Sequence, residues 1–168
     1  MPLITGPLKW YTLASDLEAA AYAGFSDKPQ RHGVVPGTIA WDDCTCGLLA
    51  VSLNQVYLSD DFPTPLNSIA GIRCDAAYEI GEYVFQIIRC APSPLSPSLS
   101  PTVAALDASA QETLRDLYEL LRSVSVELCE LEGMGSIMSH VLRPATAQGP
   151  RGACTGWELR ALVALGRN

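Results

Sequence analysis

Two stretches of the chain carry the dense apolar pattern of long strands. Between Tyr78 and Cys90 (YEIGEYVFQIIRC), apolar residues fall on both faces of an extended chain, and Gly81 with its β-branched neighbours disfavours a helix. From Gly47 to Leu58 (GLLAVSLNQVYL), apolar and polar positions alternate, which is typical of a half-buried antiparallel strand. We therefore predict two long strands, with the second of them, 78–90, in the middle of a sheet.

Two other stretches carry apolar residues at helical spacing. Over Thr12–Phe25 they recur every three or four positions, which predicts a short amphipathic helix. A longer stripe runs over Leu106–Leu131, and Ser109 and Glu112 have the spacing of a capping box. Its inner members are Ala110, Leu114, Leu117, Leu121, Val124 and Leu128. This stripe predicts a central helix of about 26 residues, roughly 39 Å long.

The segments between these elements are rich in turn residues. Residues 26–40 and 59–67 predict surface loops, and the alternating prolines and serines of 91–105 predict an extended connector that cannot join a sheet. Residues 133–153 are expected to be irregular, with one short strand around Ile137–Leu142.

The two ends of the chain differ. Residues 1–9 are apolar and proline-bearing without a period, so we expect an arm that orders on a neighbour. Residues 157–165 alternate again and predict a last strand. The order helix, strand, strand, helix, strand predicts one α+β domain over 1–168. In it, an antiparallel sheet of about four strands packs against a short N-terminal and a long central helix.

The amino-acid composition argues against several classes of protein. Of the 168 residues, 48% are hydrophobic and 17% charged, enough apolar surface to build a core. The net charge is −7 and lysine occurs only as Lys9 and Lys28, so no basic surface for binding nucleic acid is expected. Neither a membrane span nor a signal peptide is predicted, because prolines interrupt the longest uncharged stretch and the N-terminus lacks a basic end.

The cysteines are expected to be thiols of a reducing cytosol that pack as small buried hydrophobes. They are Cys44, Cys46, Cys74, Cys90, Cys129 and Cys154. Cys44 and Cys46 together with Cys74 or Cys90 suggest a zinc site, but the single residue between the first two would point their sulfurs to opposite faces of a strand. We therefore expect no metal, no cofactor and no catalytic role for the cysteines.

No enzyme signature stands out. The two histidines, His32 and His140, lie in no recognisable triad context, and the common phosphate, hydride and metalloprotease motifs are absent. Asp42 and Asp43 suggest paired carboxylates, but no third acid or histidine is close in sequence. We favour a turn capped by either aspartate, with Trp41 packed beside it, at the entry to the first long strand.

Acidic residues cluster at two positions in the sequence. Glu127, Glu130 and Glu132 lie in the last turns of the long helix, where the helix dipole already supplies negative charge. Asp60 and Asp61 lie in the turn after the first long strand. A solvated surface is the simpler interpretation, and the functional one is a surface that faces something negative, such as DNA that must slide past without sticking.

A longer pattern resembles a known family. It comprises Gly37-Thr-Ile-Ala-Trp-Asp-Asp-Cys44, Gly47 opening Leu-Leu-Ala-Val, and Tyr57-Leu-Ser-Asp-Asp-Phe-Pro63. It continues with Cys74, Arg89-Cys-Ala-Pro92 and Gly149-Pro-Arg-Gly-Ala-Cys-Thr-Gly-Trp157, and covers most of residues 33–165. This pattern is similar to proteins encoded in the head and tail gene block of actinobacterial siphophages, and among these the tail terminator fits best.

The resemblance implies a tail-terminator-like fold and a structural role without catalytic residues. The chain would form a hexameric ring in the virion, at the head–tail junction, after assembly in the host cytoplasm. The ring would bind the major tail tube protein on one side and the head–tail connector on the other, and DNA would pass through its bore unbound. A head–tail stopper or other connector ring is the alternative within this class. A small cytosolic enzyme or thiol–metal protein is the alternative outside it.

Overall fold

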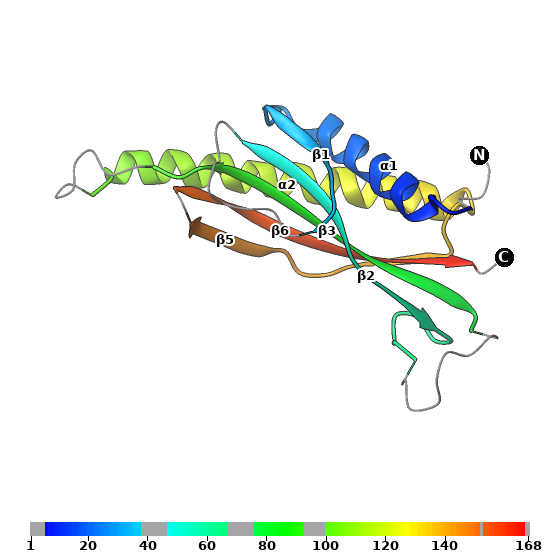
Figure 1. The fold of residues 1–168 in the computed structure, drawn as a ribbon. Coiled ribbons are helices and arrows are strands. Elements are labelled where there is room, and N and C mark those ends of the chain that lie inside the picture. Colours follow the sequence, from blue (N-terminus) through cyan, green and yellow to red (C-terminus); the bar gives the residue numbers. More distant parts are fainter. Residues whose placement is uncertain (1–5, 38–46, 67–75, 93–99, 152, 167–168) are drawn as a thin grey trace.

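A computed structural model describes residues 6–37, 47–66, 76–92, 100–151 and 153–166. Two helices cover one face of a mixed six-stranded sheet (Figure 1). The elements are α1 (Lys9–Gly24), β1 (Arg31–Val35), β2 (Leu48–Ser59), β3 (Tyr78–Cys90), α2 (Val103–Gly133), β4 (Ser139–Leu142), β5 (Thr146–Arg151) and β6 (Cys154–Gly166). The strand order is β1-β2-β3-β6-β4, and β5 also pairs with β6. The predicted α+β class is confirmed.

The three long strands form the middle of the sheet, because their apolar residues need cover on both faces. β3 pairs antiparallel with β2 along one side and with β6 along the other. Tyr83, Phe85 and Ile87 of β3 belong to the core under the helices, while Ile80 packs in a smaller cluster with Leu162 and Ala164 of β6. The prediction that 78–90 is central is therefore confirmed.

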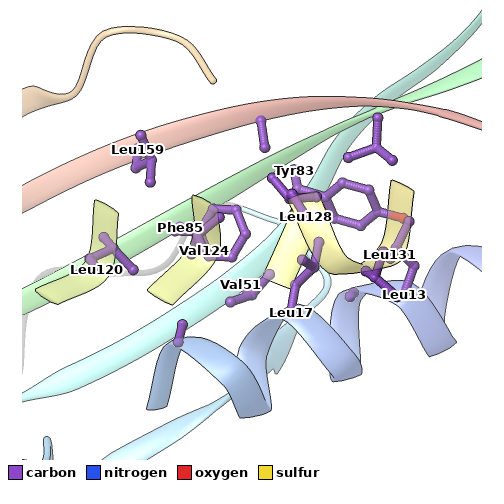
Figure 2. Close-up of a cluster of buried hydrophobic side chains, with 14 of the residues drawn as sticks. Leu13, Leu17, Val51, Tyr83, Phe85, Leu120, Val124, Leu128, Leu131 and Leu159 are labelled. Carbon is purple, nitrogen blue, oxygen red and sulfur yellow. The ribbon is translucent and has the colours of Figure 1, made fainter. Parts of the chain in front are cut away.

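The main core lies between the sheet and the two helices (Figure 2). Leu13 and Leu17 of α1 and Leu128 of α2 are fully buried against Val51 and Tyr83. Burying each large aliphatic side chain stabilises the fold by about 1.5–3 kcal/mol. The Tyr83 hydroxyl donates to the Trp10 carbonyl at 3.1 Å, and burial raises the pKa of Tyr83 well above its ordinary value.

Helix α1 begins three residues before the predicted start at Thr12, so Lys9 of the expected arm is helical. Residues 1–5 of that arm lie outside the described residues. Lys9 forms a salt bridge to Glu79 of β3, which fixes this end. At the other end, a Cβ added to Gly24 would lie 2.5 Å from Cβ of Ser123 in α2. Glycine is needed there because the two helices approach so closely.

Helix α2 begins earlier than expected and has 31 residues, a length of about 46 Å. The predicted capping box at Ser109 is wrong, since the N-cap is Thr102, whose side-chain oxygen accepts a hydrogen bond from the Ala105 N–H. The expected connector therefore ends before Val103. The first buried apolar residue of the helix is Leu120, and Leu106 and Leu114 are exposed. The start of the helix projects past the sheet (Figure 1).

The sheet has the predicted strands and two more. β1 lies inside the expected loop 26–40 and pairs parallel with β2, so the sheet is mixed rather than wholly antiparallel. β5 lies inside the stretch expected to be irregular, whereas the short strand predicted around 137–142 is present as β4. β6 begins at Cys154, three residues before the predicted start. No helix among the described residues is long and apolar enough to cross a membrane.

Candidate functional site

The acidic residues predicted at the end of α2 separate into two environments. Glu127 is half-buried and lines a groove of about 410 Å³ between α1 and α2. Burial raises the pKa of its carboxyl, and the nearby Glu130 and Asp16 carboxylates raise it further. Burial also raises the pKa of Asp16, which lies on α1. The structure thus brings Glu127 and Glu130 together with an acid that the sequence pattern did not indicate.

Glu132 is directed to β4 instead. Its Oε2 lies 2.6 Å from Nδ1 of His140. Positions 130 and 132 are about 200° apart around a helix, so their side chains leave α2 on opposite sides. The three glutamates of the prediction therefore do not form one continuous acidic surface in a single subunit.

Asp60 and Asp61 are exposed in the turn region that follows β2. Asp60 Oδ1 accepts a hydrogen bond from the Ala77 N–H at 3.2 Å, and the Asp61 N–H donates to Ser59 Oγ at 3.1 Å. The β2–β3 end of the sheet extends away from the helices (Figure 1). These aspartates order the turn, and they lie on a different part of the molecule from the glutamates of α2.

A constellation that the sequence analysis missed joins Cys129 to His140 and Glu132. Cys129 Sγ lies 3.9 Å from His140 Nε2, on the ring edge opposite the one that contacts Glu132. A thiol, an imidazole and a carboxylate that contact one another in this order match the nucleophile, the base and the orienting acid of a cysteine hydrolase. The residues are 11 and 8 positions apart in sequence, so the register of β4 beside α2 was needed to find them.

The surroundings of this constellation bear on whether it could catalyse acyl transfer. Such a reaction needs a substrate pocket and donors for an oxyanion. None of the grooves of about 410, 180 and 360 Å³ that described residues line includes Cys129 or His140. Cys129 and Glu132 lie in the last turns of α2, where the helix dipole supplies negative charge. The contacts with His140 tie β4 to α2.

The second histidine ties β1 to α1. His32 Nδ1 lies 2.6 Å from Glu18 Oε1, and its ring stacks on Tyr22 with a centroid distance of 3.7 Å. His32 was expected in a loop, and it lies instead in a strand because β1 pairs with β2. No nucleophile belongs to this contact, so it is structural.

A polar network crosses the sheet. Glu158 Oε1 accepts from Arg160 Nε at 2.8 Å, and its Oε2 accepts from Gln86 Nε2 at 3.1 Å. Arg160 Nη1 also lies 3.6 Å from Glu82 Oε1, and Glu82 Oε2 accepts from Asn54 Nδ2 at 2.5 Å. A cavity of about 180 Å³ borders this network. Each charged group in it has a partner, so the network links β2, β3 and β6.

A buried ion pair marks the place where α2 leaves the sheet. Arg89 of β3 donates from Nε and Nη2 to the two Asp116 carboxylate oxygens at 2.8 and 2.9 Å. Nη2 also donates to the Asp27 carbonyl at 2.5 Å. The hydrogen bonds that Arg89 donates to Asp116 raise the pKa of Arg89. Because a buried charge is costly without its partner, this pair fixes α2 to the sheet edge and to the chain after α1.

The cysteine prediction needs correction. Cys154 is buried and takes part in a disulfide, so it is not a cytosolic thiol. Cys90 and Cys129 keep their thiols, but both are exposed rather than packed in the core. Cys44, Cys46 and Cys74, and with them the zinc arrangement, lie outside the described residues, as do Trp41, Asp42 and Asp43. No metal-binding cluster of three or more suitable side chains occurs within the described ranges.

Comparison with known proteins adds no family. No protein-family model matches the chain, and no curated protein matches it. The function must therefore be argued from the residues and the structure themselves.

Proposed function

We propose that this chain is a non-enzymatic structural protein of a long-tailed bacteriophage, a tail terminator that forms a hexameric ring at the head–tail junction. The viral setting is supported by the family resemblance of residues 33–165. The assembly role is supported by one structural observation: α2 begins past the end of the sheet, and its first part exposes Val103, Leu106 and Leu114. Apolar surface of this kind is typical of the buried core of an interface between subunits.

In this role the ring caps the tail tube. One face binds the last ring of the major tail tube protein and stops its polymerisation, and the other face binds the head's connector. The sheet and its two helices form the rigid body, because β2, β3 and β6 pair along their full lengths. Assembly takes place in the host cytoplasm, and the finished ring belongs to the virion.

DNA passes through the bore in this proposal. We propose that Glu127, Glu130 and Glu132, or alternatively Asp60 and Asp61, line it. Carboxylates repel phosphates and leave the duplex free to slide, whereas lysine or arginine would bind it by releasing counterions. The net charge of −7 is consistent with such a lining.

A phage mutant that lacks this chain tests the proposal. Electron microscopy of the lysate is expected to show overlong tails, since nothing would stop the tube from growing. Short or absent tails on full heads would identify a stopper or other connector ring instead. Normal virions would overturn both assignments.

A thiol enzyme or thiol–metal protein is the second candidate, because Cys129, His140 and Glu132 adjoin one another. Elemental analysis of the purified protein and alkylation of Cys129 test it. Stoichiometric zinc that is lost with Cys44→Ser or Cys46→Ser would support the metal protein. Alkylation of Cys129 much faster than that of Cys90, with the excess lost in His140→Ala, would support an activated thiol.

A further inference from the structure

The first part of α2 exposes its apolar side chains. We call Val103–Arg115 the α2 arm, because Asp116 is the first buried residue of the helix. Val103, Leu106 and Leu114 are 83%, 51% and 54% exposed. Near its end the arm approaches the sheet, where Glu112 Oε1 lies 3.9 Å from Arg89 Nε, and its start projects past the end of the sheet (Figure 1).

The arm continues a helix whose C-terminal part is held by the core. It therefore needs no nucleation of its own, and its stability depends on helix propagation and on the Thr102 cap. Val103, Leu106, Ala110 and Leu114 recur at spacings of three and four, so they lie along one side of the helix. This is the pattern by which a helix binds in an apolar groove.

The same chain carries such a groove. It has a volume of about 360 Å³ and lies between the start of α1, the end of β1 and the middle of β2. Its apolar walls include Leu8, Trp10, Tyr11, Val34, Val35 and Leu53. Leu8 and Tyr11 are 67% and 59% exposed, so the groove is open to a partner. We call it the α1–β1 groove.

The facing surfaces carry little charge. No charged residue lines the α1–β1 groove. Of the charged residues of the arm, Glu112 and Arg115 lie away from its apolar side and Asp107 borders that side. Two copies of a chain with net charge −7 repel each other, so contact is least costly where both surfaces are uncharged. The arm lies at one end of the molecule, and the start of α1 lies toward the other (Figure 1).

We propose that the α2 arm of one copy binds in the α1–β1 groove of the next copy. Because the two surfaces differ and lie apart on the molecule, the contact is head-to-tail and propagates from copy to copy. Such contacts close into a ring when the rotation between neighbours allows it. The inference rests on the proposed ring and names the surfaces that build it.

Two exposed substitutions test the contact in the free protein. Leu106→Glu places a charge on the arm, and Tyr11→Lys places one in the groove. Sedimentation velocity of the native protein up to about 1 mM, the weak end of specific association, is expected to show self-association. Each variant is expected to raise the dissociation constant at least about tenfold. The matched control Val56→Glu charges an exposed apolar position on β2, 47% exposed, and should associate as the native chain does.

Mixing the two variants is the decisive measurement. The Leu106→Glu copy keeps an intact groove and the Tyr11→Lys copy keeps an intact arm, so one native contact can form between them. We expect one-to-one dimers with native affinity and no larger species. A mixture that stays monomeric, variants that associate normally, or a native protein that does not associate would each overturn the inference.

The same variants separate this inference from the proposed function. If both variants complement the phage mutant and give tails of normal length, the ring is built through other surfaces and only the inference fails. If the phage that lacks this chain has normal tails, the proposed function fails. The mixing experiment then still decides whether the arm binds the groove.

Discussion

Ser136 has a buried side-chain hydroxyl group that forms no hydrogen bond with any of the described residues. It follows α2, and its backbone N–H donates to the Leu131 carbonyl at 2.9 Å. An unsatisfied buried polar group costs about 1–3 kcal/mol. Ser136→Ala is therefore expected to raise the free energy of unfolding by about 1 kcal/mol, and the Tm measured by calorimetry by about 2–4 °C. The control Ser123→Ala removes a hydroxyl that donates to the Glu119 carbonyl, so it should give no such gain. Equal Tm values for the two variants would show that the unsatisfied Ser136 hydroxyl is not the cause.

The acidic contact between α1 and α2 predicts a pH dependence. The pKa values of Asp16 and Glu127 are raised above their ordinary values, so the folded state binds these protons more tightly than the unfolded state. Tighter proton binding by these two carboxyl groups adds to the free energy of unfolding. This contribution is fully present below about pH 4 and is lost as the pH rises through the raised pKa values of the folded state. Glu127→Gln should therefore stabilise the fold at pH 7 by a few tenths of a kcal/mol, a modest amount because solvent screens the site.

Urea unfolding at several pH values measures this effect. The advantage of Glu127→Gln should shrink to nothing below about pH 4, where the native glutamate is protonated in both states. Asp107→Asn on the arm controls for the loss of one negative charge from the chain. An equal gain in the free energy of unfolding of that variant would show that net charge, and not the contact between α1 and α2, causes the effect.

At the residue scale, the sequence indicated which acids are unusual but not what they contact. The glutamates at the end of α2 could be predicted because their position conflicts with the helix dipole. The sequence pattern gave no sign of the buried Asp116, since only the register of β3 reveals that Arg89 reaches it. Cys129 and His140 were missed for the same reason, because such pairs depend on which strand edge adjoins α2.

Among the elements, α2 is expected to behave as two parts. Its C-terminal part is held by the core, whereas the α2 arm depends on its own propensity and on the Thr102 cap. Thr102→Ala should cost the arm about 1 kcal/mol, seen by hydrogen exchange as faster exchange over 103–110. Exchange in β3 and the Tm should change little. Equal losses in the arm and in β3 would show that the arm unfolds together with the core.

The elements that the sequence predicted well are those whose own patterns are strong. β3 has the predicted boundaries because both of its faces are apolar. β1 and β5 were missed because each is short and mostly polar or exposed, and each is held by pairing with a long strand. The stripe of α2 predicted a helix, but not where the sheet beneath it ends. That boundary depends on tertiary structure, so Leu106 and Leu114 were expected to be buried in the core.

At the scale of the whole molecule, the α2 arm lies at one end and the α1–β1 groove lies toward the other, so the contact proposed between them is head-to-tail. In the proposed ring, the charge of the chain would decide how the bore acts on DNA. A negative bore would exclude counterion release, so the duplex would gain nothing by stopping. Glu130 and Asp61 are both exposed, so each is able to act on a passing polyanion.

Two charge reversals of equal size locate the bore. Glu130→Lys and Asp61→Lys each raise the net charge of −7 by two, so only the position of the change differs. In assembled phage, the substitution that faces the bore is expected to slow DNA ejection in vitro. The rate should recover as salt is raised, because added lysines bind phosphates by releasing counterions. The other substitution should leave ejection unchanged and serves as the control. If Glu130→Lys and Asp61→Lys both eject at the native rate at every salt concentration, the acidic residues point outward and the negative charge of the chain serves solubility alone.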